Sequence, residues 1–243
     1  MTEQSRLSVL IYRAEAQASP EHQSGASANS PQDINRAARD SAGGLLALVP
    51  AGSRLPEGLL QRCVAALEKH PATQAVYPAH TAGEAASRPF MAQGPFRPGS
   101  LTRRNAVGPV AVLRRGAWDK LGGLRTGLSI SMALWDFWLR LALAQPDPAS
   151  IRRLPALLAQ CPPRDAFAQH GNDARNDGRA KALLVVHTPG AFEADVCRWA
   201  MALLRGEAWA RPHAPGLIPT AAEVRRMWES GRRACPGELL RSA

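Results

Sequence analysis

Asp136 and Arg140 stand four residues apart in a strongly helical stretch, so they would lie one turn apart on a helix. Asp136 carries a carboxylate, and a carboxylate held next to reacting atoms can donate or accept a proton. The alternative is an exposed ion pair with Arg140, worth a few tenths of a kcal/mol. Arg140 and the neighbouring Trp135 are candidates for substrate binding, although tryptophan at this helical spacing is more often buried in a core.

Two consecutive arginines, Arg114 and Arg115, follow an apolar run, and guanidinium groups at the end of a strand could bind an anion. One of them should face solvent, because neighbouring strand residues point to opposite sides. Ser53 lies in GSR and lacks the GxSxG context of a nucleophile. The four cysteines form no CxxC pair, so we expect reduced thiols, no metal and no cofactor. Five of the histidines show no pairing with an acid or a cysteine: His70, His80, His170, His187 and His213.

Short apolar runs indicate strands at Leu7–Tyr12, Leu45–Val49, Thr73–Tyr77 and Val107–Leu113. The run Leu45–Val49 is unbroken, which is typical of a strand buried on both faces of a parallel sheet. Apolar residues between Pro56 and His70 share one helical face, so strand, helix and strand follow one another. We predict an α/β fold with a mainly parallel central sheet flanked by helices.

The strongest helical signal begins near Ser129 and continues to Ala142, with apolar residues at every third or fourth position. Its apolar face should be buried against the sheet through Leu134, Phe137, Trp138 and Leu141. A shorter helical turn, Trp118–Leu121, ends at Gly122-Gly123. Two stretches, residues 19–32 and 78–104, are predicted to be loops.

The C-terminal third is predicted to be mainly helical. Residues 182–186 fit a strand or a helix end, and residues 192–204 form an amphipathic helix. Thr220 and Glu223 have the spacing of a capping box, so a last helix should begin there. We expect three parts: residues 1–32 with the first strand and a flexible loop, 33–160 as the core, and 161–243 as a helical extension.

Three segments resemble the family-2 glycosyltransferases, nucleotide-sugar enzymes whose fold is a single mixed sheet flanked by helices. The resemblance covers about Asp33 to Gln145, in the family's order and spacing. It is carried by INRAARDSAGGLLALVPAGSRLPEGLLQRCVAALEKHP, GPVAVLRRGAWDKLGGL and ALWDFWLRLA, the last similar to the family's EDWDLWLRLA. It implies a glycosyltransferase A-like fold with a sugar nucleotide or glycan as ligand, in the synthesis of cell-surface polysaccharide or another glycan. With such a ligand, Arg114 and Arg115 could reach the diphosphate from the end of their strand.

The sequence departs from that family at three places. The family's DxD motif, which holds a divalent cation, corresponds here to Pro50-Ala51-Gly52-Ser53, without a carboxylate. The family's ED pair, which supplies the base, corresponds to Ala133 and Leu134. Asp136 matches only the second acidic place of EDWD, and this match makes it a candidate catalytic carboxylate. Fewer than 50 residues precede Pro50, so the nucleotide-binding half is expected to be shortened. The resemblance thus implies a degenerate member, a pseudoenzyme.

Composition limits the remaining classes of function. The chain has 243 residues, 45% of them hydrophobic, and no apolar run long enough to span a bilayer. The start MTEQSRLSV lacks a secretory signal, so we expect a cytoplasmic protein, with a peripheral site at the inner membrane face as an option. The net charge is +10, and all but three of the 30 basic residues are arginine, which fits either phosphate binding or a GC-rich coding sequence.

Three functions remain open from the sequence. The first is a degenerate glycosyltransferase-like protein that binds a glycan, a sugar nucleotide or a partner protein. The second is an active, metal-independent transferase in which arginines replace the cation. The third is a basic adaptor that docks on an acidic protein or an anionic surface through residues 78–104 and the last helix. Nucleic acid ranks low, because basic residues do not alternate with aromatic ones.

Overall fold

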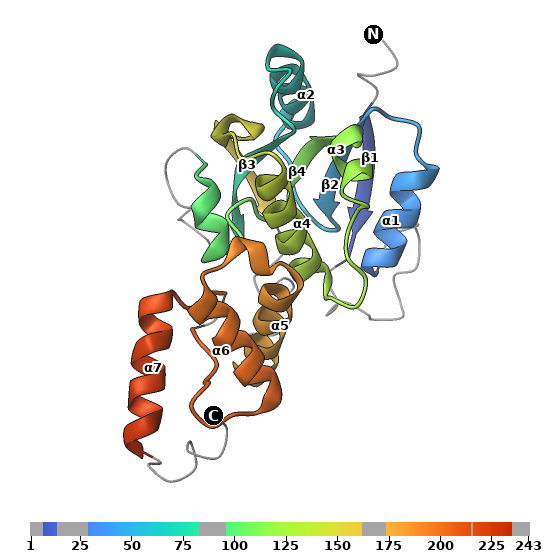
Figure 1. Cartoon of the computed structure of the whole chain (residues 1–243). Coiled ribbons are helices and arrows are strands. Elements are labelled where there is room, and N and C mark those ends of the chain that lie inside the picture. The colour runs from blue at the N-terminus through green and yellow to red at the C-terminus, as the bar shows by residue number, and fades with distance from the viewer. Residues whose placement is uncertain (1–6, 14–28, 83–95, 162–173, 215, 235–243) are drawn as a thin grey trace. The chain divides into compact units, whose positions relative to one another are not determined.

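The computed structural model describes residues 7–13, 29–82, 96–161, 174–214 and 216–234, which belong to two compact units. The first unit comprises residues 1–101 and 105–169, and the second comprises 102–104 and 170–243. Most of the loop predicted at 19–32 and the middle of the loop predicted at 78–104 lie outside the described residues. Figure 1 shows the elements of each unit.

The first unit contains a mixed sheet with the order β1-β2-β4-β3-β5 in its described part (Figure 1). Strands β1, β2, β3 and β5 point in one direction, and β4 is antiparallel to both of its neighbours. The bounds are β1 Leu7–Tyr12, β2 Leu45–Pro50, β3 Ala75–Ala82, β4 Ala111–Arg114 and β5 Ile151–Cys161. The predicted α/β fold with a mainly parallel sheet is therefore confirmed.

Helix α2, Leu59–Lys69, covers one face of the sheet. Its buried residues Leu59, Cys63 and Leu67 belong to a cluster with alternate residues of β2, namely Leu45, Ala47 and Val49. The opposite face is also covered, since Leu46, Leu48 and Leu113 are fully buried. Burial on both faces explains why β2 is continuously apolar.

Local sequence signals mark the start of helix α1, Pro31–Asp40, and the end of helix α3, Arg115–Lys120. The Ser30 side chain accepts a hydrogen bond from the Asp33 amide, and Pro31 occupies the first helical position. Ser30 is therefore the N-cap of α1. After α3, Gly122 and Gly123 both adopt positive φ angles near 70°, which reverses the chain as the glycine pair predicted.

Helix α4, Ile130–Ala144, is enclosed on nearly all sides. Leu134, Phe137, Trp138 and Leu141 are at most 2% exposed, which confirms that these residues are buried. The Phe137 ring contacts those of Trp118 and Trp138, with centroids 5.0 and 5.1 Å away. The helix is thus held within an aromatic cluster.

The assignments of three strands differ from the sequence prediction. Strand β4 starts at Ala111 and not at Val107, because Gly108 has a φ of 82° and interrupts the extended backbone. Strand β3 continues to Ala82, beyond Tyr77, so residues 78–82 form a strand and not a loop. Strand β5 was not predicted from the sequence, because Arg152, Arg153 and Pro155 interrupt its apolar pattern.

The second unit is helical, with α5 Ala174–His187, α6 Ala194–Arg205 and α7 Ala221–Ala234. Residues 182–186 form the end of α5, which settles the choice between strand and helix. Trp199 of α6 is fully buried, and the Trp209 ring packs edge-to-face on that of Trp228 from α7, with centroids 4.9 Å apart. Among the described residues of both units, none of the helices has the length and apolarity needed to cross a membrane.

Candidate functional site

The carboxyl edge of the parallel strands is where open α/β sheets bind their ligands. Here β2 ends at Pro50, and the turn after it contains Gly52 with a φ of 78°. The Ala51 amide donates to the Tyr12 carbonyl at 2.7 Å, so β1 and β2 end side by side. Arg54 pairs through its backbone with Gln160 near the end of β5. Arg13 and Arg54 follow the ends of β1 and β2 and bring positive charge to this edge.

Neutral, buried groups line this edge. The Tyr12 hydroxyl donates to the Pro109 carbonyl at 2.7 Å, and burial, followed by the charge of Cys161, raises the pKa of Tyr12 well above its usual value. Burial also raises the pKa of Cys161, to about 11. Both groups therefore stay protonated at neutral pH.

His80 lies near the end of β3 and is 2% exposed. Burial, aided by the positive charge of Arg153, lowers the pKa of His80 to about 4. The imidazole is therefore neutral at pH 7, and it packs on the backbone of Gly108. In the described part of the chain, no group of three or more histidine, cysteine, aspartate or glutamate residues could hold a metal ion.

Asp136 is fully buried, so the expected exposed ion pair on a polar side of the helix is wrong. Its Oδ2 accepts from Nε of Arg140 at 2.7 Å, and its Oδ1 accepts from Arg125 at 2.8 Å. The physical reason is that α4 has almost no solvent-facing side at this position. Both carboxylate oxygens are therefore engaged with guanidinium groups, which does not favour a role for Asp136 as a catalytic base.

Arg140 also donates to the carbonyls of Leu121 and Gly123, at 2.6 and 2.8 Å. Arg140, which belongs to α4, therefore holds the glycine turn that follows α3 in place against α4. The Trp135 indole donates to the Leu101 carbonyl at 2.7 Å and is 2% exposed. Both side chains proposed to contact a substrate are thus engaged with the protein's own backbone.

Arg114 and Arg115 lie at the edge opposite the Pro50 turn, because Arg114 pairs with Leu45 at the start of β2. At ~3.3 Å per residue, five residues separate Leu45 from Pro50 by roughly 16 Å. That placement does not support the expectation that the two arginines face a diphosphate beside Pro50. Neither side chain is fully exposed, in contrast to the expectation that one would face solvent.

The two arginines stabilise helix ends. Arg114 donates to the carbonyls of Leu67 and Thr73 around the end of α2, at 2.6 and 2.9 Å. Arg115 donates to the carbonyls of Ala38 and Ser41 at the end of α1, at 2.6 and 2.8 Å. The Leu67 and Ala38 carbonyls belong to the last turns of their helices, where carbonyls lack partners within the helix and a cation is favourable.

The three segments that carry the family resemblance meet in one cluster. Asn35 of α1 exchanges two hydrogen bonds of 2.8 Å with the backbone of Leu124, next to the glycine turn. A Cβ on Gly123 would lie 2.4 Å from Oδ1 of Asn35, so the turn needs glycine there. Asn35, Arg115 and Arg140 come from the three segments that resemble the family, and all three hydrogen-bond to the protein's own backbone. These residues of the resemblance therefore stabilise the fold.

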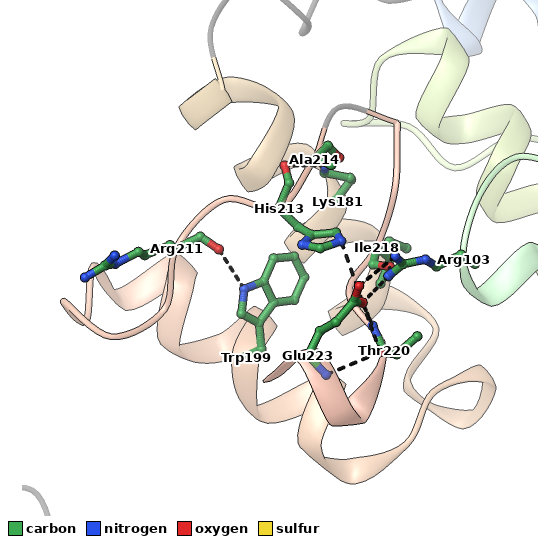
Figure 2. A network of polar contacts seen from close by, with 9 residues as sticks. All are labelled: Arg103, Lys181, Trp199, Arg211, His213, Ala214, Ile218, Thr220 and Glu223. Carbon is green, nitrogen blue, oxygen red and sulfur yellow. Dashed lines mark hydrogen bonds and ion pairs between the residues drawn. The ribbon is translucent and has the colours of Figure 1, made fainter. Parts of the chain in front are cut away.

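The second unit contains a polar network that the sequence analysis did not assemble (Figure 2). Glu223 forms an ion pair with Arg103 and accepts from the Thr220 amide at 2.7 Å, which confirms the capping box. The hydrogen bonds to Arg103 are the main reason that the pKa of Glu223 falls to about 2. His213 lies 3.7 Å from the same carboxylate.

Lys181 extends this network and is fully buried. It forms an ion pair with Asp177, one turn earlier on α5. It also donates to the carbonyls of His213 and Ala214, at 3.3 and 2.9 Å (Figure 2). Burial lowers the pKa of Lys181, while Asp177 opposes the shift. In the sequence, the aspartate four residues earlier is the one sign that Lys181 is buried, because α5 has no pronounced apolar face.

No family model and no curated protein matches this sequence. Among solved structures, the chain is similar to Staphylococcus aureus TarS 1–349 in complex with UDP-GlcNAc, at 12% identity and a TM-score of 0.46, over 73% of this chain and 53% of that one. It is also similar to the mannosyltransferase PcManGT from Pyrobaculum calidifontis in complex with GDP-Man and Mn²⁺, at 17% identity and a TM-score of 0.45, over 88% of this chain and 62% of that one. The chain thus spans about half of the TarS structure and less than two thirds of the mannosyltransferase. Both of those structures were solved with a nucleotide sugar, UDP-GlcNAc and GDP-Man.

Proposed function

We propose that this chain is a degenerate glycosyltransferase-family-2-like protein that binds a sugar nucleotide or glycan at the carboxyl edge of its sheet, without metal-dependent transfer. The proposal places it in the cytoplasm, in the synthesis of cell-surface polysaccharide or another glycan. The observation that carries it is the chemistry of this edge. Residues Pro50–Ser53 contain no carboxylate that could bind a cation. Asp136, the carboxylate that matches the family's EDWD string, is buried and paired with two arginines.

Positive charge supports a metal-independent contact with a diphosphate. Arg13 and Arg54 stand just beyond the ends of the neighbouring strands β1 and β2, and Arg54 is exposed. One guanidinium group can bind two phosphate oxygens at once, and this contact needs no metal cation. These two arginines take over the role that the sequence analysis gave to Arg114 and Arg115.

A metal-independent transferase is the second candidate, favoured by the same two arginines. It needs a group that accepts a proton from the acceptor hydroxyl. At this edge, His80 is neutral at pH 7 but buried, and Tyr12 and Cys161 are protonated. None of the three offers an exposed base, so binding without transfer is the better supported reading.

Calorimetric titration of the full chain with UDP-GlcNAc and GDP-mannose, with and without Mn²⁺, tests the proposal. We expect heat of binding that does not depend on Mn²⁺, and no release of nucleoside diphosphate in the same samples. Arg54→Glu should weaken the affinity about tenfold or more, since a charge-assisted bond contributes ~1.5–3 kcal/mol. Arg226→Glu, on exposed α7, is the matched control and should bind like the wild type.

Manganese-dependent turnover of any sugar nucleotide would overturn the proposal. Metal-independent turnover abolished by His80→Gln would establish the second candidate instead. Absence of binding to every sugar nucleotide and to a panel of glycans would refute both.

A further inference from the structure

Strand β1 has an apolar face that its own unit leaves exposed. Val9 and Ile11 are 46% and 48% exposed, although they lie in register with the buried residues Ala47 and Val49 of β2. These neighbours belong to the core that α2 covers. The apolar face of the sheet therefore continues onto β1, past the area that α2 protects.

The backbone N–H and C=O groups of Val9 and Ile11 also point away from β2. The Tyr12 carbonyl accepts from the Ala51 amide, so the peptide groups of Tyr12 face β2. Because a strand repeats every two residues, those of Leu10 face β2 as well, and those of Leu7, Val9 and Ile11 face outward. Within the described residues, β1 pairs with β2 alone.

Edge strands of soluble proteins are usually protected by charges, proline or a bulge. The sequence LSVLIY has no charge and no proline, and its register with β2 is continuous. The adjoining sequences are polar: MTEQSR precedes β1, and AEAQASPEHQSGASA follows Arg13. They offer Met1 as their one large apolar side chain, which is too little to bury Val9 and Ile11.

We propose that β1 pairs antiparallel with β1 of a second copy of this chain, so that one continuous sheet runs through a two-fold dimer. A two-fold contact needs a single self-complementary patch, and β1 supplies one. With Val9 opposite the partner subunit's Val9, Leu7 lies opposite the partner subunit's Ile11. This register places all three outward-facing residues in hydrogen-bonded pairs and forms about six backbone hydrogen bonds.

The side chains and charges fit that register. Leu7, Val9 and Ile11 of both copies share one face, so six apolar side chains form a continuous stripe. The Arg13 side chains of the two copies stand at opposite ends of the paired strands. The paired residues Leu7–Tyr12 carry no charge, so the net charge of +10 is not concentrated at the contact.

The proline variant Val9→Pro removes the outward N–H at the centre of the contact. Proline is tolerated on an edge strand where the N–H faces solvent, so the monomer should fold. By light scattering after gel filtration, the wild type should be a dimer, and Val9→Pro and Val9→Lys should be monomers with the wild-type circular dichroism spectrum. Leu143→Lys, at another exposed apolar residue, should remain a dimer.

Cross-linking tests the register independently. Val9→Cys, in a Cys197→Ser, Cys235→Ser background, places two thiols in one hydrogen-bonded pair with Cα atoms ~5.5 Å apart, which a disulfide can span. Mild oxidation should yield a covalent dimer, whereas Leu143→Cys should not cross-link. A wild type that is monomeric up to millimolar concentration, a dimer that survives Val9→Pro, or equal cross-linking of both cysteine variants would overturn the proposal.

Discussion

A Cβ atom on Gly108 would lie 2.1 Å from Cε1 of His80, so the imidazole occupies the space that any other residue at position 108 would need. Gly108 also has a φ of 82°, which side chains rarely adopt. The Asn105 side chain fixes the turn by accepting from the Gly108 amide at 3.0 Å. The glycine is therefore required for two reasons, conformation and close approach.

Gly108→Ala should lower the free energy of unfolding by about 2–4 kcal/mol, because strain at positive φ adds to the displacement of His80. Gly127 is the matched control, since its φ is 84° and no atom lies within 4 Å of its virtual Cβ. Gly127→Ala should therefore lose only about 1 kcal/mol. Urea unfolding measures both values, and equal losses would show that His80 does not press on Gly108.

His80 should make the protein less stable in mild acid. Its folded pKa of about 4 lies below the usual 6.5, so the unfolded chain takes up the proton first as pH falls. The stability is present above pH 6.5 and is lost as pH falls towards 4, by about 2 kcal/mol between pH 7 and 5. Urea unfolding at the two pH values should show this loss, and His80→Gln should remove most of it. An unchanged pH dependence in His80→Gln would assign the loss to other groups.

Much of the fold follows from apolar periodicity. The run Leu45–Val49 and the three-four repeat from Ile130 predicted β2 and α4, because buried elements leave a strong pattern. Strand β5 was missed, since Arg152 and Arg153 interrupt the pattern although their backbone pairs with β3. The antiparallel direction of β4 was not predicted either, because direction depends on pairing between distant segments.

The candidate site was less predictable than the fold. The sequence showed that Pro50–Ser53 lacks carboxylates, but it gave no sign that Arg115 faces the end of α1. A guanidinium that binds carbonyl oxygens and one that binds a phosphate look alike in a sequence. Only the antiparallel register of β4 with β2 places Arg114 and Arg115 at the edge away from Pro50.

Asp136→Asn should destabilise the first unit by about 3 kcal/mol, since it leaves two guanidinium groups next to a neutral amide in a buried site. Arg140 keeps its carbonyl contacts, so the loss should stay below that of an unpaired buried charge. Asp119→Asn makes the same chemical change at an exposed position of α3 and should alter stability by less than about 0.5 kcal/mol. Similar values for the two variants in urea unfolding would contradict the buried ion-pair cluster.

Arg115→Ala should weaken the end of α1, because three carbonyls and the Ser41 hydroxyl lose a donor. We expect a loss of about 2–3 kcal/mol, with little rescue by Arg115→Lys, since an ammonium cannot reproduce the guanidinium fork. Affinity for sugar nucleotides should be unchanged at protein concentrations where the variant is folded. A weaker affinity with unchanged stability would restore the ligand role expected from the sequence.

Glu223→Gln should loosen the start of α7, where the carboxylate pairs with Arg103 and caps Thr220 (Figure 2). The folded pKa of about 2 lies below the usual 4.5, so this stabilisation is present above pH 4.5 and is lost as pH falls towards 2. Hydrogen exchange at pH 7, followed by mass spectrometry, should show faster exchange in peptides from residues 216–228 of the variant. Glu229→Gln, on the exposed side of the same helix, should exchange like the wild type.

Acid titrations followed by circular dichroism test the role of the carboxylate charge. The difference in stability between the wild type and Glu223→Gln should shrink between pH 4.5 and 2. A difference that persists in full at pH 2 would contradict this role.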